Sequence, residues 1–138
     1  MTDVKDLFRT PGDVDSFGFD WGHLSVVLGP RVNGAQKFSA AVVTLPPGKG
    51  HTRHNHPGAE EIIFVISGSG EQMVEDAAGN AETVTVSAGC TVYVPEGRFH
   101  STRNTGPGPM QLFVVYSPAG PELELRALPD FRILPKGT

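Results

Sequence analysis

A repeated alternation of short β-prone runs with Gly- and Pro-rich turns restricts most strongly how this chain can fold. Runs of four to ten residues, rich in Val, Ile, Thr, Phe and Tyr, follow one another through most of the sequence. They span residues 23–28, 36–45, 61–66, 71–76, 82–87, 91–94, 99–104 and 110–117. The 17 Gly and 12 Pro are too many for a helical bundle and suit frequent tight turns. The pattern predicts an all-β protein, built as an antiparallel sandwich or closed barrel.

The length sets the domain organisation. A chain of 138 residues is enough for one domain with a single core. We expect a partly ordered N-terminal arm over residues 1–20, a β-barrel over residues 21–120 and a C-terminal tail over residues 121–138. Within the tail, only residues 122–128 suggest a short helix.

Charge and composition exclude several classes of partner. The formal net charge is -4 and the 11 Lys and Arg form no run, so we expect no nucleic-acid partner. No apolar stretch approaches the roughly 20 residues of a membrane-spanning helix, and the N-terminus is too polar for a signal peptide. The single cysteine, Cys90, cannot form an internal disulfide, which agrees with a reducing compartment. We therefore expect a cytoplasmic protein that binds no membrane.

The run at residues 61–66 is apolar on both faces and would aggregate as an exposed edge strand. If Glu61 faces the interior, alternation places Ile63 and Val65 there too, and the intervening residues face outward. One face would line the core, and the other could meet a second subunit. The sequence thus favours a homodimer.

Three histidines and two glutamates gather within eleven residues. Because side chains alternate along a strand, His54 and His56 would point to the same side. A Pro-Gly-Ala segment then breaks the strand, after which Glu60 or Glu61 can return a carboxylate to the same place. His51 lies outside this spacing and is expected at the rim or on the surface.

A second segment adds another histidine. The chain turns through Glu96 and Gly97 toward His100, on a strand where His100 could face His56. Three neutral imidazoles and one carboxylate suit one divalent ion such as iron, manganese, nickel, cobalt, copper or zinc. Four protein ligands would leave positions open on an octahedral ion for water, dioxygen or a chelating substrate.

These two segments resemble the two sequence motifs of the cupin superfamily. The first motif is matched at Gly48, His54, His56, Glu61 and Gly68. The second is matched at Gly89, Pro95, Gly97, His100 and Asn104. The resemblance implies a double-stranded β-helix, or jelly-roll barrel, and a metal held by His54, His56, Glu61 and His100. It selects Glu61 over Glu60, and the glycines and proline would shape turns.

Further residues are candidates for supporting the site. Polar groups in a barrel mouth can orient metal ligands or bind anionic substrates. The candidates for these roles are Gln72, Tyr93, Arg53, Arg98 and Tyr116. Glu61 is the candidate catalytic residue, which would supply negative charge and proton transfer.

Two hypotheses on function follow from the resemblance. The first is a metal-dependent enzyme acting on a small oxygenated metabolite, either dioxygenase-like or of the isomerase or lyase type. The second is a non-catalytic protein that uses the metal to bind a sugar or organic acid, because cupins host both roles. Substrate turnover would distinguish the two hypotheses, and oxygen consumption would separate the enzymatic versions.

Overall fold

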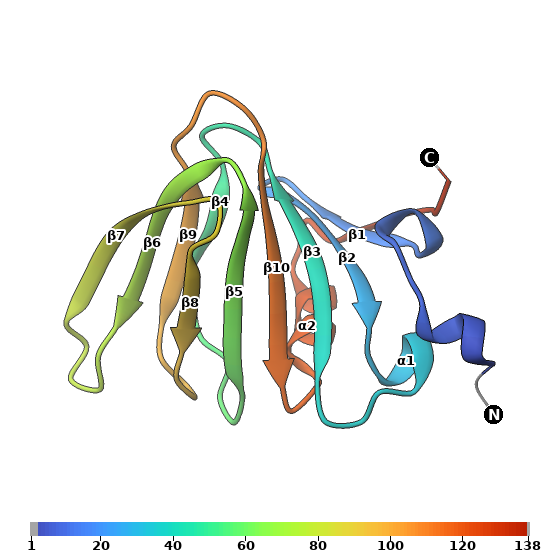
Figure 1. Cartoon of the computed structure of the whole chain (residues 1–138). Helices are drawn as coiled ribbons and strands as arrows, with labels where there is room; N and C mark the ends of the chain where they lie inside the picture. The colour runs from blue at the N-terminus through green and yellow to red at the C-terminus, as the bar shows by residue number, and fades with distance from the viewer. Residues whose placement is uncertain (1–2, 138) are drawn as a thin grey trace.

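Two antiparallel β-sheets face each other across one core in the computed structural model, which describes residues 3–137 (Figure 1). The jelly-roll barrel expected from the sequence is confirmed. Residues 1 and 2 of the expected arm and residue 138 of the expected tail lie outside the described residues.

The sheets differ in size. Among the described residues, the larger sheet has seven strands in the order β11-β1-β2-β3-β10-β5-β8. These are β1 (Ser16–Phe19), β2 (Gly22–Leu28), β3 (Ser39–Leu45), β5 (Glu60–Ser67), β8 (Thr91–Val94), β10 (Met110–Ser117) and β11 (Arg132–Leu134). The smaller sheet has the order β4-β9-β6-β7. Its strands are β4 (Gly50–His54), β6 (Ser69–Glu75), β7 (Ala81–Ser87) and β9 (His100–Asn104).

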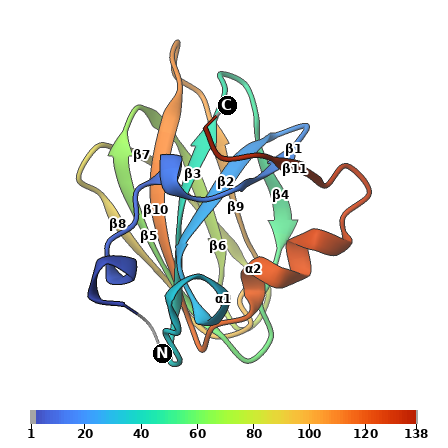
Figure 2. The same cartoon turned by 90° about the vertical axis from the view of Figure 1, so that its right-hand side faces the viewer.

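Short helical turns lie outside the sheets. They are η1 (Val4–Leu7), η2 (Pro11–Asp13), α1 (Pro30–Asn33), α2 (Pro121–Glu124) and η3 (Leu125–Ala127), where η marks a 3-10 helix. The short helix expected in residues 122–128 is present as α2 and η3. Figures 1 and 2 show α1 and both described ends of the chain on the side of β1 and β2, away from β7. Within the described chain, every helix is too short or too polar to span a bilayer.

The larger sheet extends beyond the barrel limits expected from the sequence at both ends. Strand β1 lies within the expected arm and pairs with β2, and β11 lies within the expected tail and pairs with β1. Phe17 and Phe19 of β1 are consequently buried. The four-residue run that forms β1 contains a glycine, which weakens any local strand signal. The pairing of Ser16 with Leu134 supplies the stabilisation that the local sequence lacks.

Strand β5 alternates as the sequence predicts. Glu61, Ile63 and Val65 are buried, whereas Ile62 and Phe64 are 45% and 39% exposed. The outer face of this strand, which lies next to the edge strand β8, is therefore apolar and open to solvent in the single chain.

The inner face of the smaller sheet is polar. His100, Thr102 and Asn104 of β9 alternate into the interior and are buried, as is Gln72 of β6. The larger sheet supplies mainly apolar side chains to the same interior. A polar layer therefore faces an apolar one, and the candidate site lies between them.

Asn104, the last residue of the second motif, ties the end of β3 to the loop between β9 and β10. Its fully buried side chain donates to the carbonyl oxygens of Leu45 and Gly108, each at 2.8 Å. It also accepts a hydrogen bond from the Gly106 amide at 2.9 Å. Its role is structural, since each of these bonds satisfies a backbone group in a turn.

Asn104→Ala should lower the free energy of unfolding by about 2–4 kcal/mol, because three backbone groups lose their partner. Urea denaturation followed by circular dichroism measures this change. Thr105→Ala, at an exposed neighbouring position, is the control and should change the free energy by less than about 0.5 kcal/mol. Equal losses in the two variants would contradict the assigned role.

Candidate metal centre

The two motif segments bring their histidines together between the sheets. Strand β4 ends at His54, whose backbone partner across the ladder is His100 of β9. His56 lies two residues beyond β4, in the turn that leads to β5, and its side chain is buried. The expectation that His100 lies on a separate strand and could face His56 agrees with the 5.2 Å between their ring centroids, although the ladder partner of His100 is His54. The chain leaves the sheet after His54, so His56 reaches the interior from a loop.

Four side chains converge at this point. The nitrogen atoms that His54, His56 and His100 can offer to a metal all lie within 4.8 Å of one another. Glu61 Oε1 lies 2.9 Å from His100 Nε2 and 3.3 Å from His56 Nε2. The neighbouring Glu60 is exposed and accepts a hydrogen bond from Tyr93 outside the cluster. The structure thus selects Glu61 as the inward carboxylate.

Backbone carbonyl groups set the orientation of two of the imidazoles. His54 Nδ1 lies 2.6 Å from the Thr52 oxygen, and His100 Nδ1 lies 3.0 Å from the Arg98 oxygen. A carbonyl oxygen only accepts hydrogen bonds, so each Nδ1 carries the proton. The Nε2 lone pair of each ring is left for a metal ion, as in metal sites whose histidines are held by an outer partner.

Several facing atoms of the cluster have no hydrogen-bond partner. They are both ring nitrogens of His56, Oε1 of Glu61 and Nε2 of His100, all fully buried. The short contacts between Glu61 and the two imidazoles do not have hydrogen-bond geometry. Each buried polar atom without a partner costs about 1–3 kcal/mol. A cation bound among these atoms would remove that cost, so the donor set fits a divalent metal ion.

The protonation states also suit a metal. Burial, with smaller contributions from the adjacent His51 and His100, lowers the pKa of His54 to about 3. Burial would raise the pKa of Glu61, but the neighbouring His100 and His56 outweigh it and lower that pKa to about 2. A neutral imidazole and an ionised carboxylate at neutral pH are the forms that bind metals.

The pKa of His100 shifts in the opposite direction to that of His54. Burial would lower the pKa of His100, but the Glu61 carboxylate outweighs burial and raises it. Protons will therefore compete with a metal for His100 before they compete for His54.

A narrow cavity of about 40 Å³ surrounds the cluster. Its apolar walls include Leu24, Val43, Leu45, Ile63, Leu112 and Val114. Its polar lining outside the cluster comes from Trp21, His51, Thr102 and Tyr116. The burial of Ile63 in this wall follows from the alternation predicted for β5.

His51 is a cavity residue that the sequence analysis placed at the rim or surface. Its ring stacks on Trp21, with 4.5 Å between centroids, and on His54, with 3.7 Å between centroids. Burial, with the neighbouring His56 and His100, lowers the pKa of His51 to about 4. Residues three apart in a regular strand face opposite sides, but the register of β4 shifts between His51 and His54. This irregularity places both rings in the cavity. The local sequence pattern does not predict it.

Two of the predicted supporting residues lie at or next to the cavity. Tyr116 is buried in its wall, with its ring 5.2 Å from that of His56 in an edge-on contact. Burial, then the charges of Glu61 and Glu122, raise the Tyr116 pKa well above its ordinary value, so its hydroxyl stays protonated. Gln72 accepts a hydrogen bond from Thr102, which it thereby orients.

The other three candidates have different partners. Arg53 pairs with Glu75, and its guanidinium lies 3.7 Å from the centre of the Phe99 ring. Arg98 donates to the Glu75 carbonyl oxygen at 3.4 Å. Tyr93 is exposed and donates to Glu60. None of the three is among the described residues that line the cavity.

Fold and site together define a small β-barrel protein with an internal cluster of three histidines and one glutamate. The family profile of the cupin domain matches residues 41–116, which is more than half of the chain and includes the whole cluster. The protein therefore belongs to the cupin family.

Individual relatives are more distant. Germin-like protein 1 of Brassica napus is 32% identical over 124 residues, 90% of this chain and 54% of that protein. The glucose-6-phosphate isomerase of Thermococcus kodakarensis is 37% identical over 68 residues, 49% of this chain and 35% of that protein. The oxalate decarboxylase of Lactobacillus farciminis, solved as a formate complex, is 28% identical in sequence, with a TM-score of 0.70. The match covers 78% of this chain and 31% of the oxalate decarboxylase chain. The chain spans about half or less of these relatives.

His100→Ala should abolish stoichiometric metal binding while the barrel stays folded. Loss of a direct ligand should reduce affinity by more than the roughly 10–100-fold that loss of an outer-shell partner costs. Elemental analysis after dialysis against Mn²⁺ or Zn²⁺ measures occupancy, and circular dichroism checks the fold. His23→Ala, which removes an exposed histidine, should keep full occupancy. Full occupancy in His100→Ala would contradict the ligand assignment.

Proposed function

We propose that this protein is a metal-dependent enzyme acting on a small organic acid, with one divalent first-row ion held by His54, His56, His100 and Glu61. The observation that carries the proposal is the convergence of these four side chains in a narrow cavity, with buried and unpartnered donor atoms on His56, Glu61 and His100. Three neutral imidazoles and one carboxylate leave a formal charge of -1, which a divalent ion more than neutralises. When bound, the ion would supply Lewis-acid charge and open positions for two substrate oxygens.

The residues around the cluster support chemistry in a dry site. The apolar walls from the larger sheet exclude water, which strengthens every electrostatic interaction inside. Glu61 is ionised, so it can hold the negative charge of the site or accept a proton at a carboxylate oxygen. The protonated Tyr116 hydroxyl can donate a hydrogen bond to a substrate oxygen.

The size and charge of the cavity limit which substrates it can bind. A free space of about 40 Å³ is far below the roughly 300–1,000 Å³ of ordinary ligand pockets, so the substrate has few atoms. No Lys or Arg is among the described residues lining the cavity, so a bound metal would have to neutralise an anionic substrate. These features favour an oxo-, hydroxy- or dicarboxylic acid of two to four carbons over a sugar phosphate. The similarity to an oxalate decarboxylase agrees with this choice.

Decarboxylation or oxidation of such an acid is the proposed reaction type. The same geometry also suits a protein that captures the acid without turning it over, so the decisive measurement is turnover. Protein loaded separately with manganese, iron, nickel or zinc should be incubated with oxalate, glycolate, pyruvate and glucose 6-phosphate. Release of CO₂ and consumption of O₂ then distinguish the two reactions.

Glu61→Gln should reduce kcat for the best acid at least about 100-fold, because the variant loses the charge and the proton acceptor. Tyr116→Phe should reduce kcat/KM about 10-fold or more, since it removes one hydrogen-bond donor. Both rates are measured in protein of verified metal content. Tyr93→Phe, which removes the hydroxyl of an exposed tyrosine outside the cavity, is the matched control and should retain full activity. Binding of the acid without turnover under all four metals would favour the capture hypothesis.

We also propose that a second copy of the chain covers the outer face of β5. Ile62, Phe64 and Ile66 on β5 are 45%, 39% and 42% exposed, and Tyr93 on the adjacent β8 is 58% exposed. A contiguous exposed apolar row is unfavourable in water and is typical of an association surface. A symmetric pair of such rows would bury each against the other.

Phe64→Lys should shift the protein from dimer to monomer, because it places a charge in the apolar row. Sedimentation velocity at micromolar concentration measures the change in mass. Ile133→Lys, at an exposed position on β11, is the control and should leave the dimer intact. A monomeric parent protein would refute the proposal.

A further inference from the structure

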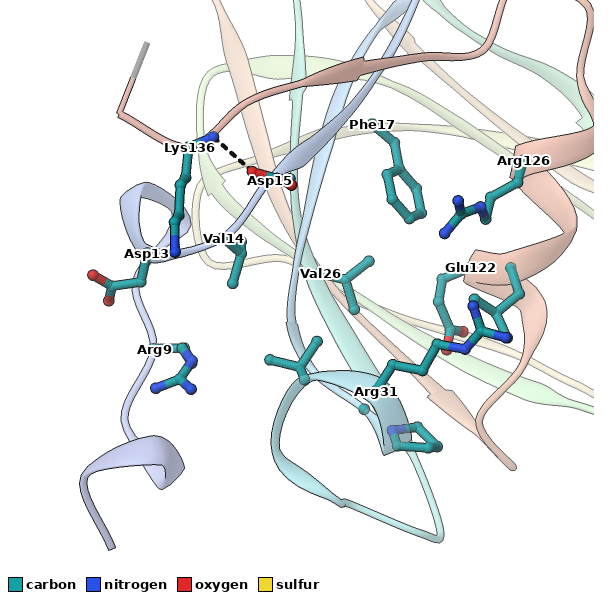
Figure 3. Close-up of a pocket in the computed structure, with 14 residues that line it drawn as sticks. Arg9, Asp13, Val14, Asp15, Phe17, Val26, Arg31, Glu122, Arg126 and Lys136 are labelled. Atoms are coloured by element: carbon teal, nitrogen blue, oxygen red, sulfur yellow. Dashed lines mark hydrogen bonds between the residues drawn. The ribbon is translucent and has the colours of Figure 1, made fainter. Parts of the chain in front are cut away.

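A second hollow lies apart from the metal cavity, between the N-terminal segment, α1, the α2–η3 turn and the C-terminal residues (Figure 3). Its volume is about 400 Å³, and it has no lining residue in common with the metal cavity. That volume falls in the range of ordinary small-molecule sites, roughly 300–1,000 Å³. The hollow can therefore hold a molecule far larger than any the metal cavity admits.

The floor of this hollow is apolar. Phe17 of β1, Val26 of β2 and Val32 of α1 line it. The Phe17 ring is held by an edge-on contact with Phe131, with 5.2 Å between centroids. A hydrocarbon or aromatic body would bury apolar surface against this rigid floor.

Basic side chains from four separate segments surround the floor. Arg9, Arg31, Arg126 and Lys136 all line the hollow (Figure 3). Arg9 pairs with Asp6 at 3.1 Å, but none of the other three forms an ion pair within 4.0 Å with a residue in the described range 3–137. The Arg126 guanidinium lies 5.6 Å from the centre of the Phe17 ring, directly at the edge of the apolar floor.

The acidic residues of the same hollow are already engaged by the chain itself. Asp13 accepts hydrogen bonds from Thr10, and Asp15 accepts one from the Lys136 amide at 2.8 Å. Glu122 accepts from the Ser39 hydroxyl at 2.7 Å and from the Gly120 amide at 3.1 Å. The acids are thus engaged by hydroxyl and backbone donors. Hydrogen bonds from Thr10, with smaller contributions from the charges of Arg9 and Lys136, lower the pKa of Asp13, so Lys136 is partly engaged by that acid. Arg31 and Arg126 remain for a ligand. The lining carries four basic and three acidic side chains, so it is more positive than the chain as a whole, whose net charge is -4.

We propose that this hollow binds an amphipathic carboxylate, with its head group at Arg31 and Arg126 and its apolar body on Phe17, Val26 and Val32 (Figure 3). Arginine is suited to this role because its planar guanidinium can donate two parallel hydrogen bonds to one carboxylate. The proposal does not depend on the function assigned to the metal centre.

Octanoate is the probe, because it combines one carboxylate with an apolar body. Titration followed by isothermal calorimetry should give one site per chain, and amide chemical shifts should change at residues 9–17, 26–32 and 122–136. Acetate lacks the body and octanamide lacks the charge, so each should bind at least about 10-fold more weakly. Equal affinity for octanoate and octanamide would overturn the proposal.

Variants test the placement of the head group. Arg31→Glu and Arg126→Glu should each weaken octanoate at least about 10-fold, because they replace attraction by repulsion. Arg103→Glu makes the same change of charge at an exposed site on β9 and should leave the affinity unchanged. His100→Ala should also bind octanoate normally, which separates this site from the metal centre. Unchanged affinity in both hollow variants, or loss of binding in His100→Ala, would refute the assignment.

Discussion

The convergence of three imidazoles and one carboxylate at a single point between the sheets, two of the imidazoles and the carboxylate being buried, is the interaction on which the rest of the structure depends. Glu61 comes from the larger sheet and His100 from the smaller one, so their contact exists only when the two sheets close on each other. Burying polar groups without partners is unfavourable. Carbonyl groups of Thr52 and Arg98 satisfy the outer nitrogens of two rings, and the inner atoms are left facing one another. A cation bound among these inner atoms would give them the partners that they lack.

The division of the interior into a polar and an apolar layer follows from this arrangement. On β9, Thr102 is oriented by Gln72, and Asn104 holds the loops at the end of the strand. The larger sheet faces them with aliphatic side chains that keep the cavity narrow. One layer thus positions hydrogen-bonding groups and the other excludes water, which is the combination that a reaction on a small acid requires.

The terminal segments add a second environment beside the first. Leu125 lines the metal cavity, whereas the next residue, Arg126, lines the outer hollow. A single turn of η3 therefore forms part of both walls. The cavity around the histidines is narrow and has no Lys or Arg among its described lining residues, whereas the outer hollow is larger and bordered by basic side chains, so the two suit different molecules.

The sequence by itself determined most of the strands, because these depend on alternation between neighbouring residues. Alternation also predicted that Ile63 and Val65 of β5 share the face of Glu61. The resemblance to the cupin motifs supplied the set of four converging side chains and selected Glu61 over Glu60. Sequence analysis missed β1 and β11, did not predict that His54 is the ladder partner of His100, and left His51 at the rim or surface. Only the tertiary structure decided these points, together with the partners of Arg53, Arg98 and Tyr93 and the hollow formed by four distant segments. The physical reason is that these features depend on contacts between segments far apart in the sequence. The contacts arise from sheet closure, from the register shift in β4 and from pairing between the chain ends. Local sequence patterns do not predict such contacts.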